Sequence, residues 1–401
     1  MTEDMPFGER LKRARTRAGM SRPVLGSLMG KSAEWVKAIE TGRNLPPRLP
    51  TVLRLAEVLS VHDLAELTGD ERLKTSTFGR TTHEQLSEVA NAVVSYPMPS
   101  QIGPADLGDL QVRVRQTWEL WHGARHHRTA IAALLPTLLR DARIVTRWTE
   151  GADHSLALTL QAQTYHLAQL YLSWQPTPEL ITLTGDRAMI AAQDADDPYA
   201  IAAAAWYVNH VYRDAGQQHD ARMELANDAA ALLDPERSDE DRALYGLLHL
   251  AVALSHAKLG HDGDAWHYWD TADRAVKALP GSYTHPWLLF GRGMVDAYAI
   301  TMLLDLARPG EAMRHADRVD VDSIGSATRR SFHTIEVARA YHADRQDLAT
   351  VHLLKRAELT APDTARFNLF TRGVVPELAE HGGTTVRDDA RALADQLGLT
   401  A

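Results

Sequence analysis

The sequence predicts an all-α protein in two parts: a head of short helices in the first 70 residues, and a stack of helix pairs from about residue 106 to the end. Two observations support this. Apolar residues recur at helical spacing along most of the chain, with Gly and Pro at the breaks, and no stretch longer than a few residues alternates at period two. A spacing of small residues also repeats along the second part.

The head divides into five helices by its stop and cap signals. Gly19 ends a first helix that starts near Phe7, and Ser21 caps a second that carries Pro23 in its first turn and ends at Gly30. We expect the remaining helices at residues 32–41, 49–59 and 60–68. Residues 71–105, rich in Pro and Gly, read as a linker with one amphipathic helix near 82–95.

Composition limits the compartment and the chemistry. The 401 residues contain no cysteine, which excludes disulfides and thiolate metal sites and fits a reducing cytoplasm. The N-terminal segment lacks the apolar core of a signal peptide, and no run of about 18 apolar residues occurs. We therefore expect a soluble cytoplasmic protein that does not contact a membrane.

The net charge of −9 hides a basic island. Residues 10–48 hold ten Lys or Arg side chains and two acidic ones, which gives +8. Such an island suggests a polyanionic partner for this part of the chain. A solvated basic helix face explains the charge equally well.

The second and third helices have the arrangement of a helix-turn-helix. "MSRPVLGSLMG" and "KSAEWVKAIETGR" are two short helices joined by a tight turn at Gly30. On a helical wheel, Val36 and Ile39 of the third helix point one way. The residues that point the opposite way are Glu34, Lys37, Ala38 and Thr41, with Ala33 and Trp35 on the flanks. A helix that enters the major groove of DNA needs such a division.

Residues 7–68 resemble the Cro/repressor-type (XRE family) helix-turn-helix domain. The signature is "GERLKRARTRAGMSRPVLGSLMGKSAEWVKAIETGRNLP", in which "IETG" (39–42) matches the end of the family's recognition helix. The resemblance implies binding to double-stranded operator DNA, palindromic and bound by a homodimer. It also implies that Arg15 and Glu40 form a structural ion pair between the first and third helices.

The same resemblance implies DNA contacts for nine residues. Base-reading positions are Ala33, Glu34, Lys37 and Ala38, and phosphate candidates are Arg22, Ser32, Trp35, Arg43 and Asn44. Glu34 would accept a hydrogen bond from cytosine and Lys37 would donate one to guanine. Two alternatives without any DNA contact remain open. Trp35 would cover the core of the head, and Glu34 with Lys37 would form a solvated i, i+3 pair.

The second part carries a repeat. In residues 245–279 the small residues are Ala253, Gly260, Ala265 and Ala272, at offsets 0, 7, 12 and 19. Residues 200–233 repeat the scheme with Gly216 and Ala221, and weaker copies occupy 156–195, 294–319 and 331–362. A hairpin at 110–147 and a helix at 385–397 would cap the stack. The pattern resembles tetratricopeptide (TPR) repeats and predicts a TPR-like α-solenoid at 106–401, with an irregular helical bundle as the alternative.

Heads followed by such repeats resemble the peptide-responsive RRNPP regulators and many actinobacterial regulators. The resemblance implies a concave groove that binds a signalling peptide or small ligand, with Asn209 as the first candidate contact. The other candidates are Trp206, His210, Arg213, Tyr165 and Gln169. The bland alternative is that Trp206 and Tyr165 pack in the core and that His210 is a satisfied polar group.

Enzyme chemistry finds no support in the sequence. There is no Gly-rich phosphate loop, no His-Glu-x-x-His and no Gly-x-Ser-x-Gly. His122, His126 and His127 have a spacing that suits a metal but lack evident further ligands, so we expect neither a metal site nor a cofactor.

We therefore predict a transcriptional regulator of the quorum-sensing type: a dimer whose head binds DNA and whose acidic second part binds a ligand, dimerises, or both. The alternative hypothesis is a TPR adaptor or scaffold, whose groove binds a protein partner while the head only localises it.

Overall fold

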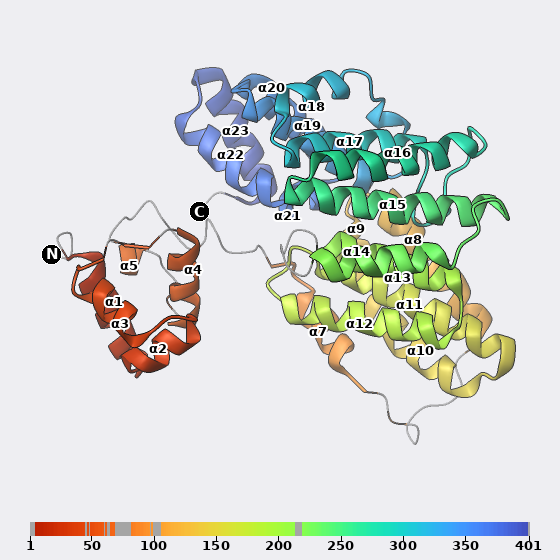
Figure 1. Cartoon of the computed structure of the whole chain (residues 1–401), viewed down its shortest axis with the longest axis horizontal. Helices are drawn as coiled ribbons and strands as arrows, with labels where there is room; N and C mark the ends of the chain where they lie inside the picture. Colours follow the sequence, from red (N-terminus) through yellow and green to blue (C-terminus); the bar gives the residue numbers. More distant parts are fainter. Residues whose placement is uncertain are drawn as a thin grey trace. The chain divides into compact units, whose positions relative to one another are not determined.

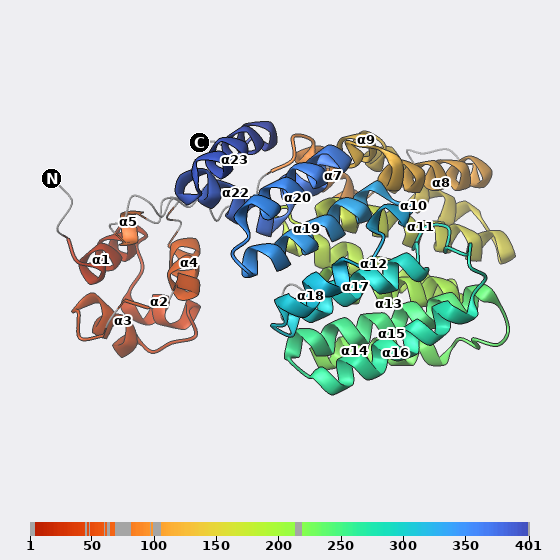
Figure 2. The ribbon, with the colours of Figure 1, turned by 90° about the horizontal axis from the view of Figure 1, so that it is seen from above.

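The computed structural model describes residues 5–44, 46–47, 49–59, 61, 65–68, 82–96, 98, 106–212 and 219–399. The chain divides into two compact units, residues 1–80 and 81–401. Every regular element in the described ranges is a helix (Figures 1 and 2), so the all-α prediction is confirmed. No described helix is long and apolar enough to span a membrane.

The first unit contains the helices that the cap signals predict. They are α1 (Phe7–Arg17), α2 (Arg22–Leu28), α3 (Ala33–Glu40), α4 (Leu49–Val58) and α5 (Ala65–Thr68). The Ser21 hydroxyl accepts from the backbone N–H of Val24 at 3.4 Å, and the Ser32 hydroxyl accepts from that of Trp35 at 3.1 Å. Both serines are therefore N-caps, as expected.

The core of the first unit is small. Each helix contributes one to three buried apolar side chains, among them Leu11, Leu25, Val36, Leu55 and Leu67, each 0 % exposed. Helices α1 and α3 touch at Gly8, where a Cβ atom would lie 2.3 Å from the carbonyl oxygen of Ile39. Only glycine permits this approach.

A buried carboxylate joins three helices of the first unit. Glu40 at the end of α3 accepts hydrogen bonds from the Nε atoms of Arg15 on α1 and Arg22 on α2, each at 2.6 Å. Its side chain is 1 % exposed. Burial raises the pKa of Glu40, but the hydrogen bonds from the two arginines outweigh it and hold the pKa below its ordinary value. The expected pair of Arg15 and Glu40 is present, and Arg22 joins it.

The second unit begins with α7 (Leu86–Val94), which the sequence placed in a linker. This helix lies where one amphipathic helix was expected, near 82–95, and its Leu86, Val89 and Val93 are buried in the main core of the second unit. Helix α7 is also fixed at its end, because Arg143 and Arg187 donate to the carbonyl oxygen of Val93 at 2.7 and 2.6 Å. These cations satisfy carbonyl groups that the helix leaves unpaired.

The rest of the unit consists of helices that pack against their sequence neighbours. The first are α8 (Leu107–Gly123), α9 (His127–Ala132), α10 (Leu135–Trp148), α11 (Gly151–Leu172), α12 (Pro178–Asp194), α13 (Pro198–Tyr212), α14 (His219–Ala231), α15 (Asp239–Leu259) and α16 (Asp262–Ala278). There follow α17 (Arg292–Asp305), α18 (Pro309–Ala316), the short 3₁₀ helix η3 (Val321–Ser323), α19 (Ala327–Ala343), α20 (Asp347–Thr360), α21 (Pro362–Phe367), α22 (Leu369–His381) and α23 (Thr384–Leu397).

The strongest repeat is confirmed and the second is corrected in register. In the pair α15–α16, Ala253, Ala265 and Ala272 are each 0 % exposed, as close helix packing requires. In the pair α13–α14, Ala221 is exposed, and Ala226, at 0 % exposure, is buried instead. Gly216 lies outside the described residues.

The second unit closes on itself. Helices α8, α11, α13, α15, α17 and α19 each contact the next, and α19 contacts α8 again. His122 at the end of α8 bonds the Ser326 hydroxyl ahead of α19 at 3.1 Å, and the Thr328 hydroxyl donates to the carbonyl of Trp121 at 2.6 Å. The predicted capping hairpin therefore contacts the late repeats and completes a ring of inner helices.

Arg128 on α9 anchors this closure from a buried position. Its side chain donates to the carbonyl groups of Leu170 and Tyr171 in the last turn of α11, and its backbone N–H donates to Asp363 on α21 at 2.9 Å. The guanidinium lies 5.1 Å from the ring centre of Phe367. Burial lowers the pKa of Arg128 to about 10, so that it still carries its charge at neutral pH.

We expect Glu40→Gln to destabilise the first unit by about 2–3 kcal/mol, because it leaves Arg15 and Arg22 without a carboxylate. Hydrogen exchange of α1 and α3 peptides in the full chain measures this, with exposed Glu57 as the control in Glu57→Gln. The folded pKa of Glu40 is depressed, so its contribution exists above the ordinary glutamate range and disappears as the pH falls. Equal exchange in both variants at neutral pH would contradict the prediction.

We expect Arg128→Leu to lower the free energy of unfolding of the second unit by about 3 kcal/mol, because two buried carbonyl groups lose their donor. Denaturant unfolding followed by circular dichroism measures it. Arg125→Leu is the matched control, since that arginine lies three residues away with 54 % of its side chain exposed. If both variants unfold at the same denaturant concentration, Arg128 does not anchor the closure.

Candidate functional site

Helix α3 presents a charged surface to solvent. Val36 and Ile39 are buried in the core of the first unit, whereas Glu34 and Lys37 have 58 % and 53 % of their side chains exposed. This is the division that the sequence predicts for a recognition helix. The Ser32 hydroxyl ahead of the helix is exposed as well as engaged in its cap.

Arg43 extends this surface beyond the helix. Its guanidinium donates to the Glu34 carboxylate at 2.7 Å, and Lys37 lies 3.9 Å from the other oxygen of the same carboxylate. The hydrogen bond from Arg43, followed by the charge of Lys37, lowers the pKa of Glu34. Glu34 is therefore an ionised acceptor at neutral pH, and the solvated i, i+3 pair is present in the free protein.

Ala38 does not belong to the exposed surface. It is 3 % exposed, and the backbone N–H of Asn44 donates to its carbonyl oxygen at 3.0 Å, so the segment after the helix folds back over this position. The prediction that Ala38 reads a base is corrected accordingly. Ala33, one turn earlier, is half-buried, and the Asn44 side chain is exposed.

The two remaining candidates for DNA contact in the first unit, Trp35 and Arg22, both interact with other parts of that unit. Trp35 is half-buried and packs against the core of the first unit, which is the bland alternative weighed from the sequence. Arg22 is committed through its Nε atom to Glu40, and 35 % of its side chain is exposed. Arg22 thus couples the start of α2 to the end of α3.

The ligand candidates of the second unit lie in its interior. Trp206 is 0 % exposed and faces the Tyr298 ring of α17, and Asn209 is 1 % exposed. The Asn209 amide donates to the carbonyl groups of Ala205 and Arg222, each at 3.0 Å. Asn209 therefore joins α13 to α14 and does not line an open groove.

The other ligand candidates are similarly enclosed where they are described. Gln169 is 0 % exposed, and Tyr165, 4 % exposed, accepts from Arg143 at 2.9 Å through its hydroxyl. His210 is half-buried and stacks on the Trp206 ring at 5.3 Å. Arg213 lies outside the described residues. The described ligand candidates are thus buried or half-buried among the inner helices.

One small cavity opens into this interior. It measures about 110 Å³ and lies between α11, α13, the start of α15 and the loop that precedes α17. Its lining includes His166, Asp197, Tyr199, Glu240 and Trp287. Partial burial, with the charges of Asp197 and Asp241, raises the pKa of Glu240. Such a cavity has an excess of negative charge beside two aromatic rings, and none of the described ligand candidates lines it.

The three histidines near the end of α8 do not gather into a metal site. His122 bonds the carbonyl of Trp287 at 2.9 Å and the Ser326 hydroxyl, His126 faces Asp363 at 3.5 Å, and His127 meets the Trp121 ring edge-on. Burial, with Arg329 nearby, lowers the pKa of His122 to about 4, so its ring is neutral.

Comparison with protein families matches the first unit. A family model described as a helix-turn-helix domain covers residues 6–68, which span α1 to α5. Residues 6–68 form a helix-turn-helix domain. This confirms the identification made from the sequence, and α2 and α3 are its two central helices. Among curated proteins no match was found.

Solved structures similar to the chain are those of ComR. The apo form from S. thermophilus is 14 % identical with a TM-score of 0.30, covering 79 % of this chain and 96 % of that one. The apo form from Streptococcus vestibularis is 13 % identical with a TM-score of 0.28 over 98 % of each chain. ComR from S. thermophilus in complex with DNA and its signalling peptide ComS is 14 % identical with a TM-score of 0.28, covering 88 % and 99 %. At these TM-scores the likeness supports no conclusion about the function of this chain.

Proposed function

We propose that this protein is a DNA-binding transcriptional regulator. The observation that carries the proposal is the helix-turn-helix domain at residues 6–68 with a solvent-facing charged surface on α3. Glu34 is an ionised acceptor suited to the cytosine amino group, and Lys37 is a donor suited to guanine. Arg43 and Ser32, at the two ends of the helix, would contact phosphates.

Binding as a dimer follows from the usual geometry of such domains. Two copies would place their α3 helices in successive major grooves, about 34–36 Å apart, on a palindromic operator. Glu34 has a second role in this proposal. In the free protein the Glu34 carboxylate accepts a hydrogen bond from Arg43. When a base donates to this carboxylate instead, Arg43 is free to donate to a phosphate.

Base-specific and phosphate contacts are separable by experiment. Glu34→Ala and Lys37→Ala are expected to relax base preference, each by about 1–3 kcal/mol of discrimination. Arg43→Gln is expected to weaken binding to all sequences and to reduce the slope of log affinity against log salt by about 0.9. The measurement is salt-dependent binding to the protein's own upstream DNA and to scrambled DNA.

Arg115→Gln on α8 is the matched control, an arginine with 70 % of its side chain exposed outside the head. It is expected to bind as the unaltered protein does. Weak DNA binding that is lost at higher salt and is unchanged in all of the head variants would contradict the regulator proposal and favour the adaptor alternative.

For the second unit we propose ligand sensing, with a ligand that carries a cationic group. The supporting observation is the cavity with Asp197 and Glu240 beside the rings of Tyr199 and Trp287. Carboxylates and aromatic faces both attract ammonium and guanidinium groups. A cavity of about 110 Å³ accepts one such group, so a peptide would insert a Lys or Arg side chain.

We expect fluorescent octapeptides with a fixed Arg or Lys to bind more tightly than those with a fixed Glu or Leu. Glu240→Gln is expected to remove about two- to fivefold of that preference. Glu236→Gln, in the loop before α15 with 86 % side-chain exposure, is the matched control. An unchanged preference in Glu240→Gln would exclude this cavity as the cation site. Anisotropy titration gives the affinities.

A further inference from the structure

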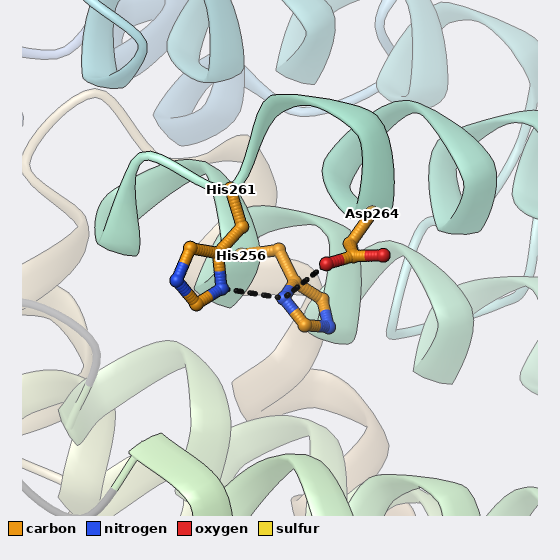
Figure 3. Close-up of side chains that lie close together, drawn as sticks. All are labelled: His256, His261 and Asp264. Carbon is orange, nitrogen blue, oxygen red and sulfur yellow. Dashed lines mark hydrogen bonds and ion pairs between the residues drawn. The ribbon is translucent and has the colours of Figure 1, made fainter.

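The turn between α15 and α16 brings three metal-ligating side chains together (Figure 3). The Nδ1 atoms of His256 and His261 are 3.4 Å apart, and Asp264 places a carboxylate oxygen 4.0 Å from the same atom of His256. One ligand atom from each residue lies within 4.8 Å of the other two. No other such group is present in the described part of the chain.

The backbone of the turn builds this cluster. Gly260 has φ of +77°, its N–H bonds the carbonyl of Ala257 at 3.0 Å, and the N–H of His261 bonds the carbonyl of His256 at 2.9 Å. These two bonds define a Schellman motif. In this motif the side chains at the positions of His256 and His261 face each other, and that contact is commonly hydrophobic. Here both residues are imidazoles.

On one side of the cluster His256 packs against Tyr268, and on the other side the cluster is open to solvent. The His256 side chain is 16 % exposed and its ring stacks on Tyr268 of α16, with centres 5.4 Å apart. His261 is exposed, and 66 % of the Asp264 side chain is exposed. The most buried member therefore lies beneath two exposed ones, and an ion can reach the cluster from solvent.

The spacing fits a tetrahedral transition metal. With metal–nitrogen distances of about 2.0–2.1 Å, two imidazole ligands of a tetrahedral ion are about 3.3 Å apart. The Nδ1 atoms are already at 3.4 Å, whereas the exposed Asp264 side chain, 4.0 Å from His256, has to move inward. Two imidazoles and a carboxylate are ligands that zinc accepts, and the nearby charge of Asp220 also favours a cation.

We propose that His256, His261 and Asp264 bind a divalent transition-metal ion of the zinc type, with a fourth position left to water or an external ligand. The ion would cross-link the last turn of α15 to the first turn of α16. The competing explanation is a neutral pair of histidines that hydrogen-bond each other at a helix end and bind no metal.

Zinc titration of the full-length protein, without a polyhistidine tag and after treatment with a chelator, tests the proposal. Calorimetry is expected to show one zinc ion per chain bound by this cluster. His261→Ala and Asp264→Ala are expected to lower its affinity more than tenfold, since loss of a ligand costs at least as much as the roughly 10–100-fold of an outer-shell change. Circular dichroism confirms that these surface variants are folded.

His267→Ala is the matched control, because His267 is an exposed histidine of α16 outside the cluster. It is expected to bind zinc as the unaltered protein does. Cobalt(II) gives a second readout: the visible bands of a tetrahedral site are expected in the unaltered protein and in His267→Ala, and absent in His261→Ala.

Two results would overturn the proposal. One is no zinc binding by the unaltered protein, which leaves the neutral histidine pair. The other is equal binding by all of the variants, which places the ion on other histidines. Neither result bears on the DNA-binding proposal.

Discussion

The second unit depends on one contact, the closure of its inner ring where α8 and α9 meet α19 and α21. Inner helices such as α11 and α15 are apolar on most sides, as befits helices with neighbours on every side. In an open stack, α8 and α19 would each leave such a side exposed. The closure buries both, and Arg128 stabilises it from within through the carbonyl groups of α11.

The ring also explains why the interior holds so many histidines. His122, His166 and His285 are buried, and burial is the main cause that lowers their pKa values to about 4, 3 and 4. Neutral imidazoles can stack on the rings of Tyr207 and Trp287 and still offer a polar edge. The interior therefore combines neutral imidazoles with a few buried carboxylates, such as Asp241 and Glu336, and with arginines held by carbonyl groups, a carboxylate and rings.

What the sequence predicts well is local. The caps at Ser21 and Ser32 follow from short-range signals and are present. The ion pair of Arg15 and Glu40 joins residues 25 apart, and it was expected only because the resemblance to the repressor family implies it. Ala38 fails because the wheel describes an isolated helix, whereas the backbone after α3 returns to cover it.

The closure itself lies beyond pattern reasoning, since His122 and Ser326 are 204 residues apart. The apolar face of α7 can be predicted from the sequence, but the sequence does not show which elements pack against that face. For the same reason the sequence does not show that Asn209 and Trp206 are buried inside the second unit. The cluster of His256, His261 and Asp264 could not be predicted from the sequence for another reason. His256 and His261 are five residues apart, a spacing that does not put two residues on one helix face. The turn at Gly260 brings their side chains together.

A closed ring constrains how any ligand signal could arise. The cavity beside α11 is one place where a ligand can act, a larger cavity of about 440 Å³ between the end of α18, η3, α19 and α20 is another, and opening of the ring is a third route. Tyr165 on α11 accepts from Arg143, and Arg143 in turn donates to the end of α7, the first described helix of the second unit. A shift of α11 would thus reach α7 through two hydrogen bonds. Coupling between sites requires an element with two discrete arrangements, and opening of the ring would supply the second one.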